Sequence, residues 1–138
     1  MAISILIVDD HALVRNGLRR HLEAQEDFSV VGEAVNGREG VAMTRELLPD
    51  VVIMDVAMPE MDGIEATRIV CGQFPQLKVV MLSIYDSTDN CIRALHGGAA
   101  GYVLKESASD EIVTAVRTIV AGERYFGVGV TNPMDLVA

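Results

Sequence analysis

The chain has 138 residues, enough for one domain with a single core. Half of its residues are hydrophobic but only 4% are aromatic, which predicts an aliphatic interior. Its 11 basic and 20 acidic residues give a net charge of -9. So acidic a chain is poorly suited to hold a nucleic acid backbone by itself. The surplus of carboxylates indicates either simple solubility or an acidic site that needs a cation.

Two further features argue against other protein classes. Cys71 and Cys91 lie far apart without paired spacing, so neither a disulfide framework nor a zinc site is expected. The first apolar run, Ile3 to Val8, ends at Asp9 and is too short for a signal peptide or a membrane span. These features predict a soluble, cytoplasmic protein with no membrane partner.

Five short apolar runs predict strands. The runs are nearly continuous rather than alternating, which is typical of strands buried on both faces of a parallel sheet. In chain order they are Ile3–Val8, a weaker run around Val30–Val31, Val51–Met54, Val79–Leu82 and Tyr102–Leu104.

Segments with helical periodicity separate these runs. Capping patterns predict helix starts at Asn36, Asp62 and Ser107, another helix begins near Ser87, and Gly97–Gly98 is expected to end it. Alternating strands and helices indicate an α/β fold with a doubly wound parallel sheet. Two apolar stripes belong to this pattern: Leu13, Val14, Gly17, Leu18, His21 and Leu22 in the first helix, and Ile112, Val113, Val116, Ile119 and Val120 in the last.

The pattern predicts a domain over residues 1–122. After Gly122 the periodicity decays into a glycine-containing stretch, so residues 123–138 are interpreted as a linker or tail.

Polar side chains stand where four of the apolar runs end. Asp9 and Asp10 follow the first run, Asp55 the third, Ser83 the fourth and Lys105 the fifth. In a sheet of strand order 2-1-3-4-5 these four strands are neighbours, about 4.8 Å apart. Ligands of such sheets bind at the carboxyl ends of the strands, so the five side chains are expected to share one pocket.

The residue types in this pocket suit phosphoryl transfer. Three close carboxylates repel one another unless a cation is present, and Mg²⁺ prefers such oxygen ligands. A lysine can pair with a phosphoryl group, and a serine hydroxyl can donate to it. Taken singly, each residue also has an ordinary role: Asp10 could cap a helix, Lys105 could be a solvated charge, and Ser83 could be a plain loop residue.

The sequence resembles the receiver domains of two-component response regulators from about Ile3 to Gly122. That resemblance implies a flavodoxin-like (βα)5 fold. Five separated motifs carry it, in order and with the right spacing: Ile7-Val8-Asp9-Asp10-His11, Val52-Ile53-Met54-Asp55, Met58-Pro59-Glu60-Met61-Asp62-Gly63, Val80-Met81-Leu82-Ser83 and Gly101-Tyr102-Val103-Leu104-Lys105.

The resemblance also implies roles for the acidic residues. Asp55 would accept a phosphoryl group from a sensor histidine kinase or from a small phosphodonor. Asp9, Asp10, Asp55 and the backbone carbonyl of Ala57 would hold Mg²⁺, with Mn²⁺ as an alternative. Such a chain is a phosphoacceptor that catalyses its own phosphorylation and dephosphorylation, not an enzyme acting on other substrates.

The remaining residues would convert phosphorylation into a signal. Lys105 would hold the phosphoryl oxygens, Ser83 would move to hydrogen-bond them, and Tyr102 would follow, altering the face of the fourth helix, fifth strand and fifth helix. A packed ring with a solvated hydroxyl is the alternative for Tyr102. Many receivers have proline after the lysine; here Glu106 follows, and the isomer of the Lys105–Glu106 peptide is left open.

Two other functions fit the sequence less well. An aspartyl phosphatase would need a second aspartate two positions after Asp9, where His11 stands. A flavin-binding module would need a phosphate loop after the first strand, where Asp9 and Asp10 would repel phosphate.

The output of the switch is expected to lie outside this chain. Asn36-Gly37 and Ala100-Gly101-Tyr102 resemble the subfamily that carries a LuxR-type helix-turn-helix domain, and the 16 residues after Gly122 are too few for one. The sequence therefore favours a truncated transcription regulator, which would reach DNA only through a missing domain, over the alternative of a natural stand-alone receiver. A homodimer is compatible with the resemblance.

Overall fold

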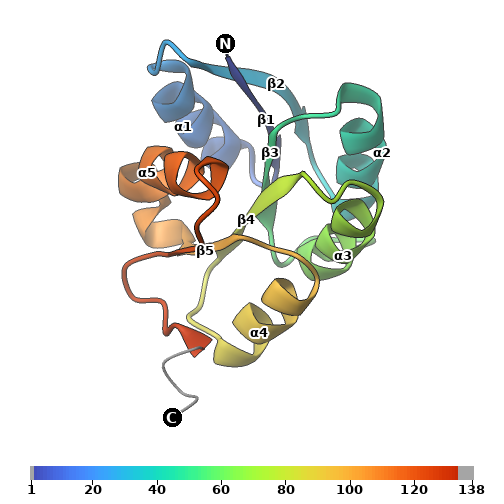
Figure 1. Cartoon of the computed structure of the whole chain (residues 1–138), viewed down its shortest axis with the longest axis vertical. Coiled ribbons are helices and arrows are strands. Elements are labelled where there is room, and N and C mark those ends of the chain that lie inside the picture. The colour runs from blue at the N-terminus through green and yellow to red at the C-terminus, as the bar shows by residue number, and fades with distance from the viewer. Residues whose placement is uncertain (1, 134–138) are drawn as a thin grey trace.

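The computed structural model describes residues 2–133 as a parallel sheet covered by helices on both faces (Figure 1). The strand order β2-β1-β3-β4-β5-β6 confirms the predicted α/β class and the order 2-1-3-4-5. The strands are β1 (Ile3–Val8), β2 (Phe28–Ala34), β3 (Val51–Asp55), β4 (Lys78–Ser83), β5 (Gly101–Leu104) and β6 (Tyr125–Phe126).

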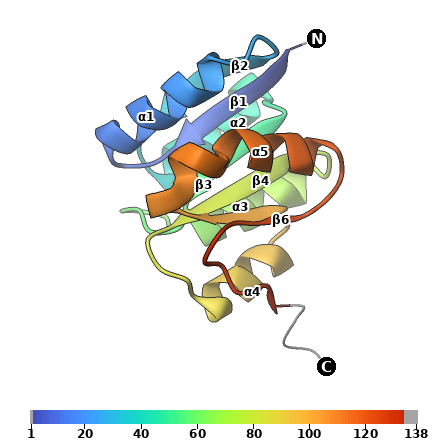
Figure 2. The same ribbon diagram turned by 90° about the vertical axis from the view of Figure 1, so that its left-hand side faces the viewer.

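Two helices cover one face of the sheet and three cover the other. The view turned by 90° looks onto the face that carries two of them (Figure 2). A short 3-10 turn, Lys105–Ser107, leads into the last helix. α1 (Ala12–Glu23) and α5 (Ala108–Val120) share one face, and α2 (Gly37–Leu47), α3 (Gly63–Gln73) and α4 (Thr88–His96) share the other.

Alternation along the strands divides the core between these two layers. In β1, Ile5 and Ile7 pack toward α1 and α5, whereas Leu6 and Val8 pack toward the other three helices. All four side chains are fully buried. Because both faces of the strand are covered, the sequence shows a continuous apolar run rather than alternating polarity.

Two of the three predicted capping residues are confirmed. Asn36 accepts a hydrogen bond from the Glu39 amide, and Asp62 accepts one from the Glu65 amide, both at 2.8 Å. The helix start predicted at Ser107 is confirmed, since α5 begins at Ala108, but the Ser107 side chain makes no capping hydrogen bond because its backbone is already helical, with φ -108° and ψ -1°. A capping side chain needs an extended backbone to turn toward the free amides of the first turn.

The predicted apolar stripe of α1 is wrong at Leu13 and His21, and that of α5 is wrong at Val120, because all three side chains are exposed. Leu18 and Leu22 are buried, but Leu13 is 86% exposed. At about 100° per residue, Leu13 lies roughly 140° around the helix from Leu18 and points away from the sheet.

The segment that follows α5 adds a sixth strand to the predicted five. Tyr125 and Phe126 pair in parallel with Gly101 and Tyr102 at the outer edge of β5. A strand of two residues has no periodicity, so sequence analysis had no pattern from which to predict it. The division into residues 1–122 and 123–138 stays a prediction, and residues 134–138 lie outside the described part.

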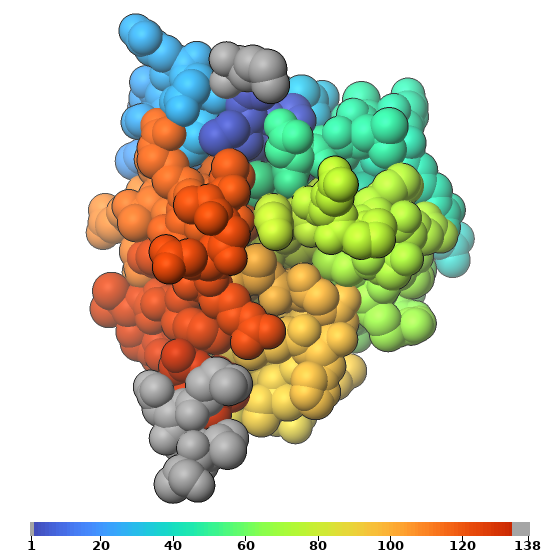
Figure 3. Space-filling view, viewed as in Figure 1, coloured from blue at the N-terminus to red at the C-terminus, as the bar shows by residue number. Residues whose placement is uncertain are grey.

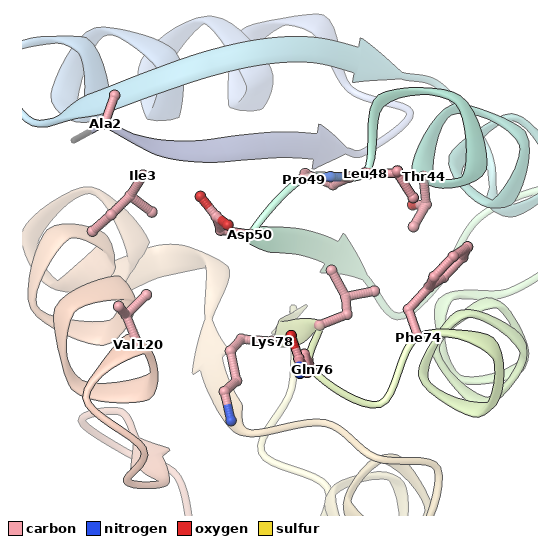
Figure 4. A pocket seen from close by; sticks show the side chains of 11 residues that line it. Ala2, Ile3, Thr44, Leu48, Pro49, Asp50, Phe74, Gln76, Lys78 and Val120 are labelled. Atoms are coloured by element: carbon pink, nitrogen blue, oxygen red, sulfur yellow. The ribbon is translucent and has the colours of Figure 1, made fainter.

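A groove lies at the amino ends of the strands, away from the predicted site. Its volume is about 480 Å³, and Ile3, Asp50 and Lys78 contribute to its wall (Figure 4). Within residues 2–133, no helix combines the length and the hydropathy needed to cross a membrane. Cys71 and Cys91 are free thiols, as predicted.

Candidate functional site

Three aspartates and one histidine meet at the carboxyl ends of β1 and β3. One potential ligand atom from each of Asp9, Asp10, His11 and Asp55 lies within 4.8 Å of the others. β1 pairs with β3 from Ile5–Val51 to Val8–Met54. The residues that follow the last pair, Asp9 and Asp55, therefore lie beside each other. The expected convergence of the acidic residues therefore follows from the pairing of the strands.

Lys105 enters the same cluster from the end of β5. Its ammonium nitrogen lies 2.9 Å from Asp9 Oδ2 and 3.0 Å from Asp55 Oδ2. The two carboxylates are almost completely buried, with side-chain exposures of 0% for Asp9 and 2% for Asp55. The peptide that joins Lys105 to Glu106 is trans.

Burial and like charge dominate the electrostatics of the site. Burial, followed by the negative charge of Asp9, raises the pKa of Asp55 to about 6, although Lys105 opposes the rise. Burial alone would lower the pKa of Lys105, but its close contacts with the carboxylates of Asp9 and Asp55 outweigh that effect and hold the pKa above its ordinary value. One lysine therefore compensates the buried negative charge only in part.

Two residues that sequence analysis did not include in the site help to position Asp9. The amide of His11 donates to Asp9 Oδ1 at 2.8 Å, and the Arg15 guanidinium donates to the Asp9 carbonyl oxygen at 2.7 Å. Arg15 is itself paired with Glu33 of β2 at 2.9 Å. The Asp9-Asp10-His11 motif could have pointed to His11, whereas Arg15 had no local signal.

Ser83 lies at the end of β4, next to the acidic cluster in strand order, but its hydroxyl is engaged elsewhere. It donates to the carbonyl oxygen of Tyr85 at 2.8 Å. The hydroxyl thus bonds within the loop that leads from β4 to α4, and it would have to leave that carbonyl to donate to a group on Asp55.

Tyr102 is a buried side chain of β5, with 1% exposure. Burial raises its pKa, and the nearby Ser83 side chain offsets part of that rise. Among the described residues, the Tyr102 hydroxyl has no hydrogen bond of good geometry. The ring is therefore packed, as the alternative interpretation held, but its hydroxyl is enclosed rather than solvated.

The loop after β3 presents Ala57 and brings Gly63 against Asp55. The Ala57 amide lies 3.4 Å from Asp55 Oδ1, a long hydrogen bond. The Gly63 amide donates to the Val56 carbonyl at 2.8 Å, and a Cβ at Gly63 would collide with the Asp55 carbonyl oxygen. The absence of a side chain at Gly63 lets α3 start directly against the backbone of the predicted phosphoacceptor.

The donor set fits a hard divalent cation. Asp9 Oδ2 is buried and, among the described residues, contacts Lys105 as an ion pair without a well-aligned hydrogen bond. Carboxylate oxygens from Asp9, Asp10 and Asp55 are the ligand type that such cations take. Burial first, and the charge of Asp9 second, raise the pKa of Asp55, and a cation bound among these oxygens would oppose that rise.

Comparison with known proteins identifies the class that this fold and acidic pocket define. Residues 5–117 match the response regulator receiver domain, and the chain belongs to that family. It is therefore the receiver domain of a two-component response regulator, a signalling protein.

Individual relatives place the chain near regulators of the LuxR and NarL type. It is 43% identical over 126 residues to the response regulator protein VraR of Staphylococcus epidermidis, covering 91% of this chain and 60% of that protein. It is 41% identical to the transcriptional regulatory protein MctR of Rhizobium johnstonii, covering 96% of this chain and 62% of that one. The chain thus spans about three fifths of these relatives.

Solved structures agree with the assignment. A LuxR-family two-component response regulator from Aurantimonas sp. superposes with a TM-score of 0.85 at 36% identity, covering 91% of this chain and 89% of the other. The receiver domain of the putative response regulator NarL of Mycobacterium tuberculosis gives a TM-score of 0.84 at 35% identity, covering 88% and 98%.

Proposed function

We propose that this chain is a phosphorylation-dependent switch in which a carboxylate oxygen of Asp55 accepts a phosphoryl group. The observation that carries the proposal is the buried Asp55 carboxylate, held 3.0 Å from Lys105 beside Asp9 and Asp10. In the reaction, the oxygen of Asp55 would form a bond to phosphorus as the bond from phosphorus to the donor breaks. The donor would be a phosphohistidine of a sensor kinase, leaving imidazole, or a small acyl phosphate, leaving a carboxylate.

The neighbouring residues have distinct parts in this proposal. Lys105, which is close to Asp9 and Asp55, would pair with the phosphoryl oxygens once they replace the carboxylate contact. Ser83 would donate its hydroxyl to the phosphoryl group, and Tyr102 would adjust beside it. A bound Mg²⁺, or alternatively Mn²⁺, would neutralise the charge that builds on the transferring group. Its ligands would be Asp9, Asp10, Asp55 and the Ala57 carbonyl.

The wider assignment also belongs to the proposal. The partner of the chain would be a sensor histidine kinase, and both proteins would meet in the cytoplasm. The chain could also form a homodimer. Transcription would be controlled through a DNA-binding domain outside this chain, because about two fifths of each relative that it matches lies outside the aligned part and MctR is named a transcriptional regulatory protein.

Phosphorylation can be tested directly by intact mass. With acetyl phosphate and Mg²⁺, the wild-type chain is expected to gain one phosphoryl group, and Asp55→Asn is expected to gain none. The matched control is Asp62→Asn, which keeps a capping side chain at the start of α3 and should be phosphorylated like the wild type. If the wild type gains no mass, or Asp55→Asn gains as much, the phosphoacceptor proposal fails.

Cation binding should be visible in stability. At a Mg²⁺ concentration of about 100 times Kd, the free energy of unfolding is expected to rise by about 2.7 kcal/mol, because only the folded chain presents the acidic cluster. Denaturant unfolding with Mg²⁺ and with a chelator measures this difference. Asp10→Asn should lose most of it, whereas Asp50→Asn, at the opposite end of β3, should retain it. Equal unfolding midpoints with and without Mg²⁺ would contradict the proposed cation site.

A further inference from the structure

The chain after α5 returns along the outer edge of the sheet. We call residues 125–131 the C-terminal strap. Its β6 part pairs with β5, and the Gly127 amide donates to the Tyr102 carbonyl at 2.9 Å. In the space-filling view this red segment lies alongside the yellow and orange atoms of α4 (Figure 3). The strap therefore rests directly on the backbone of Tyr102.

A buried carboxylate of α5 anchors the first half of the strap. Glu111 is only 7% exposed, and its Oε1 accepts hydrogen bonds from the Tyr125 hydroxyl at 2.7 Å and the Val128 amide at 2.8 Å. Burying a carboxylate is costly unless it is hydrogen-bonded. The two hydrogen bonds to Oε1 therefore support the burial of Glu111 and at the same time attach the strap to α5. This anchor does not involve the loop between β4 and α4.

A second anchor joins the end of the strap to that loop. Asp86 accepts the Thr131 amide on Oδ1 at 3.1 Å and the Thr131 hydroxyl on Oδ2 at 2.8 Å. Asp86 follows Tyr85, whose carbonyl holds the Ser83 hydroxyl at 2.8 Å. The strap is thus tied to the loop in the arrangement in which Ser83 bonds to its own loop.

We propose that the C-terminal strap is an autoinhibitory contact, which holds the Ser83–Asp86 loop in its resting arrangement and is released at Thr131 when Asp55 is phosphorylated. This inference rests on the proposed function. A serine hydroxyl has one proton to donate, so Ser83 must leave the Tyr85 carbonyl to reach a phosphoryl group. The loop would then carry Asp86 away from Thr131.

Thermodynamic linkage makes the effect reciprocal. If phosphorylation weakens the bond between Asp86 and Thr131, then loss of that bond must favour the phosphorylated arrangement by the same factor. The position of the end of the strap would then depend on whether Asp55 is phosphorylated, and a segment attached to the strap would be moved with it. Its Glu111 anchor would stay in place and set the point about which the end of the strap moves.

Phosphorylation kinetics test the inhibitory half of the proposal. With acetyl phosphate and Mg²⁺, Asp86→Ala is expected to be phosphorylated roughly fivefold faster than the wild type, because more chains would already be in the arrangement in which Ser83 has left the Tyr85 carbonyl. Thr131→Val, which removes only the strap's hydroxyl, should be faster by a smaller factor. Because Thr131 lies outside the loop, its effect separates loss of the strap contact from damage to the loop. The control is Asp89→Ala, an exposed change in the first turn of α4.

Amide hydrogen exchange tests the release. On phosphorylation the Thr131 amide should exchange faster, while the Val128 amide, held by Glu111, should keep its rate. If no chain gains a phosphoryl group, the proposed function fails and the inference fails with it. If mass confirms phosphorylation but Thr131→Val and the wild type react equally fast, or the Thr131 amide is unchanged, only the strap inference is overturned.

Discussion

At pH 8 and without divalent cations, Asp55→Asn is expected to be more stable than the wild-type chain by about 2 to 3 kcal/mol. The pKa of Asp55 is raised from its ordinary 3.8 to about 6, with burial as the largest cause and Asp9 as the next. Folding therefore disfavours the ionised carboxylate. The effect of Lys105 is already contained in that pKa, and an asparagine of the same shape removes the charge without leaving a cavity.

The pH dependence of the stability difference between Asp55→Asn and the wild type tests whether ionisation of Asp55 is its cause. A carboxyl group whose pKa is raised by folding contributes no penalty below the unfolded pKa, near 3.8, and destabilises the fold increasingly as pH rises through about 6. The difference between Asp55→Asn and the wild type should thus be small near pH 4 and complete by pH 8. Urea unfolding of both chains at each pH measures it. An equal difference at both pH values would exclude ionisation of Asp55 as the cause.

The second large effect is expected at the start of α3. Gly63→Ala should lower the free energy of unfolding by about 3 kcal/mol, because the new Cβ would meet the backbone of Asp55 rather than a side chain that could turn away. Relief would require α3 to move away from β3, which would also displace the Asp55 carboxylate. Phosphorylation by acetyl phosphate should therefore slow together with the loss of stability.

Gly72→Ala is the matched control in the same helix. A Cβ there meets nothing within 4 Å, so the substitution should stabilise the chain, by up to about 1 kcal/mol, because alanine favours a helix. Thermal or urea unfolding of the two variants compares them. If Gly63→Ala were as stable as Gly72→Ala, the close approach of α3 to β3 would not be as tight as described.

Much of the site could be predicted because its residues carry a local signal. A buried apolar run ends in a charged residue at Asp9, at Asp55 and at Lys105. A charge at such a point is costly unless it has a partner, so its position carries information about a site. Strand order then places them together, since parallel strands present their carboxyl ends on one edge. The aspartates and Lys105 did come together, within ion-pair distance for Lys105 with Asp9 and Asp55.

Other parts of the site had no such signal. Nothing in the sequence gives the direction of the Ser83 hydroxyl, which depends on the position of the Tyr85 carbonyl. The support of Asp9 by Arg15 depends on how α1 lies against β2, where Glu33 fixes the guanidinium. Ser107 had a capping sequence, but it is also the last residue of the 3-10 turn, which sets its backbone.

The sequence by itself determined five of the strands, the burial on both faces of β1, β3, β4 and β5, and the acidic edge of the sheet, because strand burial and strand-end polarity are properties of neighbouring residues. The edge strand β2 differs, since Val31 is 38% exposed. Only the tertiary structure decided the contacts between segments that are distant in the chain. Glu111 with Tyr125, and Asp86 with Thr131, meet because the chain turns back beside β5. Such pairs have no spacing that marks them, since their energy depends on burial and geometry that exist only after folding.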